Sequence, residues 1–306
     1  MKAIRLHLKQ NSANYRREET VNCRMTYPLP PYSTVIGAIH KACGYTDYHD
    51  MKVSIQGKYG SLKTRLYRNN CFQNRTENDR GTIVKMRNPD LLSNAYDVVA
   101  SAPLRDFSSY RDKKALLIDD KDLLDEFILW KKSNVKDNQF RLLTTGPMRY
   151  EMLYDIELVI HIVSDENTMQ DILDNIYNLT AIGRGEDFVE VLECTETELE
   201  EGNIAVNKGL NIYPYNMYMP LRILNKNQSS FRNKSYKEGV SASLHGTKYL
   251  LSKQYTIVVE KGVQKRVFES KYKIPVLYGT IGKLRGECDE IYKDVLNNIE
   301  IAVIFA

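Results

Sequence analysis

The segment from residue 154 to residue 194 constrains the fold more than any other part of the chain. Isoleucine or leucine occupies every even position from 156 to 162, which is the period of a half-buried strand. Apolar residues then recur at the 3.6-residue period of a helix between Met169 and Tyr177. A glycine-rich loop leads into another strand over residues 188–194. The segment therefore predicts a strand, a helix, a loop and a strand in that order.

The N-terminal part of the chain also predicts a strand followed by a helix. Apolar and basic residues alternate over residues 3–9, so a half-buried strand starts the chain. Its polar side is formed by Arg5, His7 and Lys9. Residues 34–43 are mostly apolar and predict a short helix, with Ser33 as its N-cap and Gly44 after its end.

The next segment predicts strands and then loses its pattern. Two strand-like runs at 52–56 and 61–68 are separated by residues 57–60, which predict a hairpin. Residues 69–115 are polar and irregular, as expected of a functional insertion or a disordered loop. A helix with acidic residues in its first turn is expected from about residue 120 to Lys132.

Together these elements predict an α+β fold. Their order is that of a ferredoxin-like (RRM-like) β-α-β-β-α-β domain over residues 1–200, with an insertion at about 69–115. Residues 201–306 are expected to form a mostly β C-terminal region. Its predicted elements are strands at 210–224, 248–259 and 266–281, a helix at 287–298 and a last strand at 299–305.

Several classes of protein are excluded by composition. No run approaches the roughly 18 uncharged apolar residues of a membrane span, and charges interrupt the apolar pattern at the N-terminus. We therefore expect a cytoplasmic protein without membrane contact. The cysteines are odd in number and widely spaced, and the histidines are equally scattered, so neither a disulfide framework nor a structural zinc is expected.

Motifs for nucleotide cofactors are also missing. Residues 279–284 contain two glycines and a lysine, but they lack the spacing of a phosphate-binding loop and the Ser or Thr after the lysine. The glycines at 183 and 185 follow a predicted helix, whereas a dinucleotide fingerprint follows a strand. We therefore expect no cofactor.

The charge is distributed unevenly along the chain. Residues 1–118 carry a net charge of +10, residues 119–205 one of −14 and residues 206–306 one of +8, within a total of +4. This separation favours a surface that meets a polyanion, although charge runs are often only solvated faces.

Basic residues interleaved with tyrosine favour RNA as the polyanion, because cations contact phosphates and aromatic rings stack on bases. Free amides at the start of the first helix are also suited to phosphate. The alternative interpretation is structural: most of the 21 tyrosines would be core residues, and the glycines would form tight turns. The candidate RNA-binding residues are Arg16, Arg17, Arg24, Tyr32, Ser33, Thr34, Lys41, Arg75, Arg80, Lys85, Arg87, Arg105, Tyr110, Arg111, Gly183, Arg184 and Gly185.

Acid-base cleavage of RNA is the catalytic alternative. His40 and Lys41 lie on the first helix near Tyr45, and such groups can move protons and stabilise phosphorane charge. An exposed polar helix face would explain His40 and Lys41 equally well.

Two motifs resemble the CRISPR-associated protein 5 family. The string from Tyr27 to Ile39 resembles the family's Pro-Ser-Thr-(Val/Ile)-x-Gly segment. The string from Ile182 to Val189 looks like its glycine-rich loop before the last strand of a ferredoxin fold. The two motifs have the family's order and lie roughly 150 residues apart.

The resemblance implies a subunit of a type I Cascade surveillance complex, of a type I-B-like kind, that holds the 5′ handle of the crRNA. It implies a thumb, which we place at 69–115, that packs against the backbone subunit, and a further contact with the large subunit. Target DNA is then recognised only indirectly, through base pairing with the guide.

One branch of the family cuts precursor crRNA without metal, using a Tyr, a Lys and a following His. Tyr45 is a counterpart for the tyrosine, but this chain has Lys113-Lys114 and no histidine between His49 and His161. The resemblance therefore favours a non-catalytic protein. A precursor crRNA endoribonuclease using Tyr45, His40 and Lys41 remains the alternative, and an unrelated metabolic enzyme the third possibility.

Overall fold

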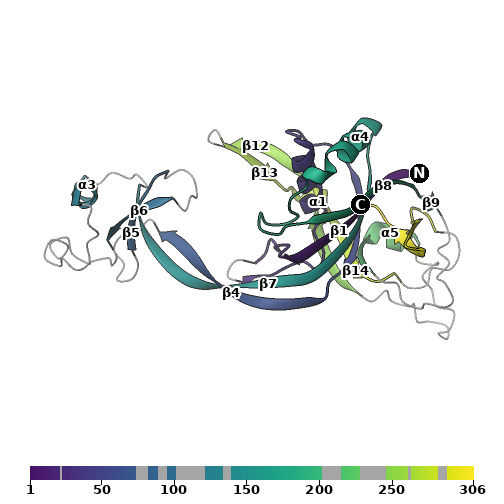
Figure 1. The fold of residues 1–306 in the computed structure, drawn as a ribbon, viewed down its shortest axis with the longest axis horizontal. Coiled ribbons are helices and arrows are strands. Elements are labelled where there is room, and N and C mark those ends of the chain that lie inside the picture. The colour runs from purple at the N-terminus through teal and green to yellow at the C-terminus, as the bar shows by residue number, and fades with distance from the viewer. Residues whose placement is uncertain are drawn as a thin grey trace. The chain divides into compact units, whose positions relative to one another are not determined.

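The chain divides into two compact units. The first comprises residues 1–65 and 150–306, and the second comprises residues 66–149. The computed structural model (Figure 1) describes residues 1–20, 23–73, 82–88, 95–100, 121–133, 139–201, 215–227, 246–260, 263–281 and 288–306. No helix in these ranges is long and apolar enough to cross a membrane.

A large sheet forms the centre of the first unit. Its strands follow one another in the order β11-β14-β10-β3-β7-β1-β8, and neighbouring strands are antiparallel. The strands are β1 (Lys2–Ala13), β3 (Lys52–Lys58), β7 (Phe140–Val163), β8 (Glu190–Glu198), β10 (Asn216–Pro220), β11 (Thr247–Ser252) and β14 (Lys273–Gly279). Two further strands, β2 (Cys23–Arg24) and β4 (Ser61–Gln73), also pair with β7.

Two helices cover one face of this sheet. They are α1 (Tyr32–Cys43) and α4 (Glu166–Asn175), and the short 3-10 helix η2 (Ile176–Asn178) follows α4. The register places Leu6 opposite Ile160, and these residues pack with Ile36 of α1 in one buried core. Alternation along β1 and β7 therefore directs every second side chain toward the helices, as the sequence predicts.

The C-terminal strands cover part of the opposite face. They are β15 (Tyr292–Leu296) and β16 (Ile299–Val303), which form a small sheet with β9 (Glu200–Glu201). The Asp294 carboxylate accepts hydrogen bonds from His161 Nε2 (2.9 Å), Arg5 Nη1 (3.0 Å) and the Thr197 hydroxyl (2.8 Å). This buried network fastens the C-terminal strands to β1, β7 and β8.

The remaining elements of the first unit are short. They are α5 (Leu221–Lys226), the two-stranded sheet of β12 (Thr256–Glu260) and β13 (Val263–Val267), and the 3-10 helix η3 (Ser270–Tyr272).

The second unit has its own core. It contains β5 (Thr82–Met86), β6 (Tyr96–Ala100) and α3 (Lys121–Lys132), together with residues 66–73 of β4 and 140–149 of β7. The apolar side of α3, including Phe127, packs against Phe140 and Ile83. The expected helix ending at Lys132 is present.

Three local predictions were wrong. The first helix begins at Tyr32 with Pro31 as its N-cap, so Ser33 lies inside its first turn. Residues 57–60 form no hairpin, because β3 and β4 both pair with β7. The helix expected at 287–298 is replaced by β15 and β16, whose connection, Asn297-Asn298, has positive φ at both residues.

The compact units also differ from the predicted domain boundaries. The predicted insertion at 69–115 lies within the longer unit of residues 66–149. The predicted C-terminal region is not separate, since β10, β11 and β14 extend the same sheet as β3. Backbone pairing across the sheet makes residues 1–65 and 150–306 one structure.

We predict that Asp294→Ala lowers the free energy of unfolding by about 3 kcal/mol, because it leaves Arg5 and His161 without their buried partner. Urea unfolding followed by circular dichroism measures this loss. The control is Glu200→Ala, which removes only an exposed ion pair with Lys293 and should change the free energy far less than Asp294→Ala does. Equal losses in the two variants would contradict the role given to Asp294.

Candidate nucleic-acid interface

Two segments predicted to contact RNA meet around one buried carboxylate. Asp187 is fully buried and accepts hydrogen bonds from the backbone amides of Asn14 (3.2 Å) and Arg184 (2.9 Å). The Gln10 amide also donates to the carbonyl oxygens of Asp187 and Ile182. The glycine-rich loop is thereby fixed to the end of β1 and to the loop that follows it.

The loop after β1 is fixed from its other side by Glu151. The Asn14 side-chain amide donates to the carbonyl oxygens of Glu151 (2.7 Å) and Arg24 (3.0 Å), and Thr26 donates its amide to the Glu151 carboxylate (3.0 Å). The described parts of this loop, residues 14–20 and 23–26, are therefore held by hydrogen bonds against the start of the first unit's part of β7.

The two glycines of the loop differ in whether a side chain could replace them. Gly183 has a φ of +112°, and a Cβ there would lie 2.8 Å from the Asp187 carboxylate. A Cβ at Gly185 would meet nothing within 4 Å. The tight-turn interpretation therefore explains Gly183, whereas Gly185 is exposed and leaves space beside the loop backbone.

Arg184 supports the loop. Its guanidinium forms ion pairs with Asp187 (2.6 Å) and Glu186 (3.0 Å) and lies over the Tyr150 ring. Its charge is therefore largely balanced within the protein. The neighbouring Phe188 is strongly exposed, and an exposed ring beside a fixed loop is suited to stacking on a base.

The three arginines of the first loop have different environments. Arg16 is exposed, and its Nη2 lies 3.4 Å from the Thr20 carbonyl oxygen. Arg17 pairs with Glu19 at 2.5 Å and lies over the rings of Tyr27 and Tyr249. Arg24 is half-buried. Arg16 is thus the most accessible of these cations, and Arg17 is held by a cation–π arrangement.

The candidate RNA-binding residues on α1 also differ in their exposure to solvent. The Tyr32 ring is fully buried against Tyr218, so the prediction that it contacts RNA does not hold for its side chain. Ser33 and Thr34 are half-buried, and the Thr34 amide donates to the Pro31 carbonyl oxygen at 3.0 Å. Lys41 is exposed.

The groups proposed for RNA cleavage do not form an open acid-base site. His40 is completely buried, and its Nε2 donates to the His49 carbonyl oxygen at 3.2 Å. Its Nδ1 lies 3.1 Å from the Tyr255 hydroxyl. The Tyr45 hydroxyl donates to Asp171 (2.8 Å), and burial together with this carboxylate raises the pKa of Tyr45. His40 is therefore a core residue rather than part of an exposed helix face.

Two candidates lie in described parts of the second unit, and both are paired. Lys85 forms an ion pair with Glu126 (2.6 Å), and Arg87 forms one with Asp97 (2.7 Å). The remaining candidates, Arg75, Arg80, Arg105, Tyr110 and Arg111, lie outside the described residues.

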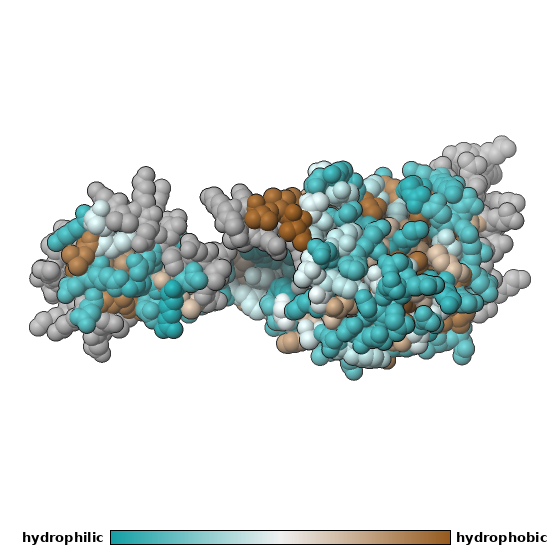
Figure 2. Space-filling view, turned by 90° about the horizontal axis from the view of Figure 1, so that it is seen from above, coloured by the Kyte–Doolittle hydropathy of each residue, from teal (hydrophilic) through white to brown (hydrophobic). Residues whose placement is uncertain are grey.

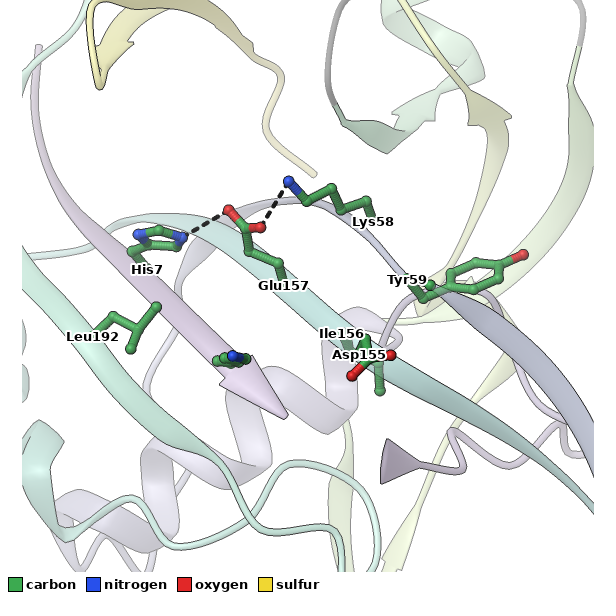
Figure 3. A pocket seen from close by; sticks show the side chains of 9 residues that line it. His7, Lys58, Tyr59, Asp155, Ile156, Glu157 and Leu192 are labelled. Carbon is green, nitrogen blue, oxygen red and sulfur yellow. Dashed lines mark hydrogen bonds and ion pairs between the residues drawn. The ribbon is translucent and has the colours of Figure 1, made fainter. Parts of the chain in front are cut away.

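A pocket of about 510 Å³ lies at the outward positions of β1, β3 and β7 (Figure 3). His7, Lys58 and Glu157 point toward one another there, with Tyr59 at the side. The Glu157 carboxylate accepts from His7 Nε2 (3.0 Å), Lys58 Nζ (2.8 Å) and the Tyr215 hydroxyl (2.7 Å). The pocket also includes the exposed Lys9 and has the size range of ligand sites.

The hydrogen bonds control the charge of this pocket. Partial burial alone would raise the pKa of Glu157, but the donors Lys58, Tyr215 and His7 outweigh it and lower that pKa to about 2. Glu157 therefore stays ionised and orients the Lys58 and His7 side chains.

Sequence reasoning assigned no function to these pocket residues. The alternation of Arg5, His7 and Lys9 was the available signal, because it places three basic side chains on one side of β1. The pairing of Lys58 with Glu157 joins residues 99 positions apart, and no pattern in the sequence revealed it. Among the described residues, no group of three or more His, Cys, Asp and Glu side chains is arranged to hold a metal ion.

One family model resembles the N-terminal part of the chain. The sequence model described as CRISPR-associated protein (Cas_Cas5) matches residues 3–112. This range includes the segment from Tyr27 to Ile39 but not the glycine-rich loop. This match confirms the resemblance to the Cas5 family that is seen in the sequence. No curated protein matches the chain.

Two solved structures are similar to the chain. One is titled "CRISPR RNA-guided surveillance complex", with 11% identity, 90% of this chain and 88% of that chain covered, and a TM-score of 0.42. The other is a crystal structure of a CRISPR protein from Archaeoglobus fulgidus, with 11% identity, 99% and 100% covered, and a TM-score of 0.37.

We predict that Gly183→Ala lowers the free energy of unfolding by about 1–2 kcal/mol, because alanine disfavours the positive φ and its Cβ meets the Asp187 carboxylate. Gly185→Ala is the matched control and should change the free energy by less than about 0.5 kcal/mol, since its Cβ meets nothing. Denaturant titrations of both variants measure the difference. Equal stability of the two would show that the loop is not fixed around Asp187.

We predict that Glu157→Gln removes an acid-dependent part of the stability. Because the pKa of Glu157 is below its usual unfolded value of about 4.3, its contribution is present above pH ~4.3 and is lost as the pH falls toward 2. After allowance for solvent screening, the loss at pH 7 should be about 1 kcal/mol. Urea unfolding at pH 7 and pH 3 should show a smaller difference between variant and wild type at pH 3. An equal difference at both pH values would contradict this assignment.

Proposed function

We propose that the protein is a non-catalytic subunit of a type I CRISPR Cascade surveillance complex that binds and caps the 5′ handle of the crRNA. The observation that carries the proposal is the convergence of residues 14–20 and 23–26 with residues 182–188 around Asp187, in a chain whose N-terminal part matches the Cas5 family model. This arrangement presents Arg16, Phe188 and the backbone at Gly185 from rigid loops. Cations, an aromatic ring and open backbone are the groups that bind single-stranded RNA.

A ferredoxin-like domain is part of this proposal. Its support is the sheet order β8-β1-β7-β3, in which β1 and β3 are connected through α1, and β7 and β8 through α4. This is the β-α-β-β-α-β sequence of elements with all neighbouring strands antiparallel. The β1 surface that carries His7 and Lys9 then belongs to the face that α1 and α4 leave uncovered.

We assign the thumb to the second unit, residues 66–149. The unit has a core of its own between β5, β6 and α3, as an insertion that contacts another subunit requires. In the proposed complex it contacts the backbone subunit, and another surface of the protein contacts the large subunit. The target DNA is recognised by guide RNA pairing, and the complex acts in the cytoplasm.

The observations at α1 favour the non-catalytic role over cleavage of precursor crRNA. Acid-base catalysis needs a group within hydrogen-bond reach of the 2′-hydroxyl, and the buried His40 has both ring nitrogens engaged. The test uses the purified chain with labelled precursor crRNA in EDTA, analysed on native and denaturing gels. The proposal expects a shifted and intact RNA, whereas a discrete cut in the repeat would make the protein the endoribonuclease.

We predict that Arg16→Glu weakens handle binding by about tenfold and lowers the slope of log affinity against log salt by about 0.7, as loss of one contact to single-stranded RNA requires. Filter binding at 50, 100 and 200 mM salt measures both quantities. The control is Arg222→Glu, because Arg222 is an exposed arginine paired with Glu290 on another element. If both variants bind like the wild type, the loop after β1 does not contact the handle.

A further inference from the structure

Two charged side chains of the pocket at β1, β3 and β7 are unpaired among the described residues. They are Lys9 and Asp155, which are both exposed. The remaining basic and acidic groups of the pocket, His7, Lys58 and Glu157, are joined to one another (Figure 3). A ligand in the pocket therefore meets one free carboxylate and one free ammonium group.

The backbone at Asp155 has an uncommon conformation. Its φ is +53°, in the left-handed region that few residues other than glycine adopt. The Gly60 amide donates to the carbonyl oxygens of Tyr154 (2.9 Å) and Asp155 (3.2 Å). A Cβ at Gly60 would lie 3.1 Å from Asp155 Oδ2, so glycine leaves the room that the carboxylate occupies. Residues in such conformations are concentrated at ligand-binding and other functional sites.

The balance of charge in the pocket favours a neutral group over a phosphate. Its two lysines are matched by two carboxylates, those of Asp155 and the ionised Glu157. The register partners of Lys9 are Glu157 on β7 and Glu190 on β8, so acidic residues lie on both sides of it. Carboxylates repel phosphate oxygens but accept hydrogen bonds from hydroxyl and N–H groups. The pocket therefore suits an uncharged group that carries donors.

Among its described lining residues, the pocket has one exposed apolar side chain. Leu192 of β8 is 47% exposed and lines the pocket from the strand beyond β1. Figure 2 shows, by contrast, a cluster of hydrophobic side chains on the surface where β12 lies. A volume of about 510 Å³ with one exposed leucine among charged groups has the size and chemistry of a small-ligand site rather than of a protein-docking surface.

Asp155 and Leu192 are far enough apart to hold a sugar and its base. Strand β1 separates their strands, β7 and β8, so two strand spacings, or about 10 Å, lie between them. Lys9 belongs to β1 and is exposed between the two. A nucleoside carries hydroxyl donors on its sugar and a flat ring that packs on apolar side chains. It can therefore bridge the carboxylate and the leucine.

The edge strand connects this pocket with the candidate nucleic-acid interface. Val189 and Val191 pack toward the core beneath the helices. By alternation, the exposed Phe188 and Leu192 lie on the other side. Their Cα atoms are at most about 14 Å apart along the chain. A single RNA strand with one base stacked on Phe188 can therefore place a nearby nucleotide in the pocket.

We propose that the pocket binds one nucleoside of the single-stranded crRNA handle, whose ribose 2′-hydroxyl donates a hydrogen bond to the Asp155 carboxylate. The inference rests on the proposed function, because that function supplies the RNA. Lys9 donates to oxygen atoms of the same nucleoside, and the base lies against Leu192. Every ribonucleotide carries the 2′-hydroxyl, which DNA lacks, so this contact reads ribose without reading sequence.

The test measures the coupling between Asp155 and single 2′-hydroxyl groups. The full chain and its Asp155→Gly variant are titrated with the labelled handle of the cognate crRNA, and with copies that carry one 2′-deoxy nucleotide at each position in turn. We expect one deoxy position to weaken wild-type binding about tenfold, and Asp155→Gly to weaken binding of the unmodified RNA equally. The two changes together should weaken binding no more than either alone, since both remove the same hydrogen bond.

The choice of variant separates this contact from general effects of charge. Glycine adopts positive φ freely, so the backbone at residue 155 is kept, and thermal unfolding verifies that the variant is folded. Loss of a carboxylate ordinarily strengthens binding to a polyanion, so charge alone predicts the opposite change. Asp47→Gly is the matched control, because it removes an exposed carboxylate from the loop after α1 and should not weaken binding.

A second variant tests the position of the base. Leu192→Asn should weaken binding of the unmodified handle about fivefold, because it removes the apolar contact with the base. Copies of the handle with one abasic nucleotide in turn should show no further loss in this variant at the position found by the deoxy series. Val295→Asn is the control, because Val295 is an exposed aliphatic side chain of β15, and it should leave the affinity unchanged.

The other outcomes overturn the inference. If Asp155→Gly binds the handle as tightly as the wild type or more tightly, or if every 2′-deoxy effect persists in it, Asp155 contacts no 2′-hydroxyl, while handle binding itself stands. Coupling of Asp155→Gly to an abasic nucleotide instead of a deoxy one would assign the carboxylate to a base and overturn its assignment to the sugar. Failure of the wild-type chain to bind the handle would refute the proposed function and this inference together.

Discussion

The burial of Asp187 is the constraint on which the candidate interface depends. Burying a carboxylate away from water costs free energy unless hydrogen-bond donors surround it. For Asp187, these donors are the backbone amides of Asn14 and Arg184 and the Arg184 guanidinium. Because these donors come from segments about 170 residues apart, satisfying one side chain fixes two loops at once. Gly183 belongs to the same constraint, since a side chain at that position would occupy the space of the carboxylate.

Strands with clear alternation could be predicted from the sequence, because period-2 burial depends only on local order. The strands expected at 3–9 and 154–163 correspond to β1 and β7, although both extend further. The hairpin expected at 57–60 and the helix expected at 287–298 were wrong, because pairing between strands distant in the sequence decides the structure there. Gly57 lies inside β3, where the Glu157 backbone leaves no room for a Cβ, so its glycine marks a close approach rather than a turn. The turn at Asn297-Asn298 was visible as a two-residue hairpin signal and was overlooked.

The candidate site was only partly predictable, because residue type reveals chemistry but not burial or pairing. The loops that carry Arg16 and Gly183 were expected and are brought together. The charge of Arg17, however, is taken up by Glu19 and two aromatic rings, and the Tyr32 ring lies in the core. The exposed Phe188 was missed because a single apolar residue at the start of an expected strand gives no signal of exposure.

The network around Asp294 has a consequence for the time course of folding. Strands β1, β3 and β7 leave the ribosome before β15 and β16, so part of one face of the sheet stays uncovered until β15 and β16 have been made. The carbonyl oxygen of Val53 and the hydroxyl of Ser54 then receive the backbone amides of Ala306 and Ile304. These contacts span about 250 residues, so completion of the first unit is a slow, late step during which chaperones have access to the open sheet.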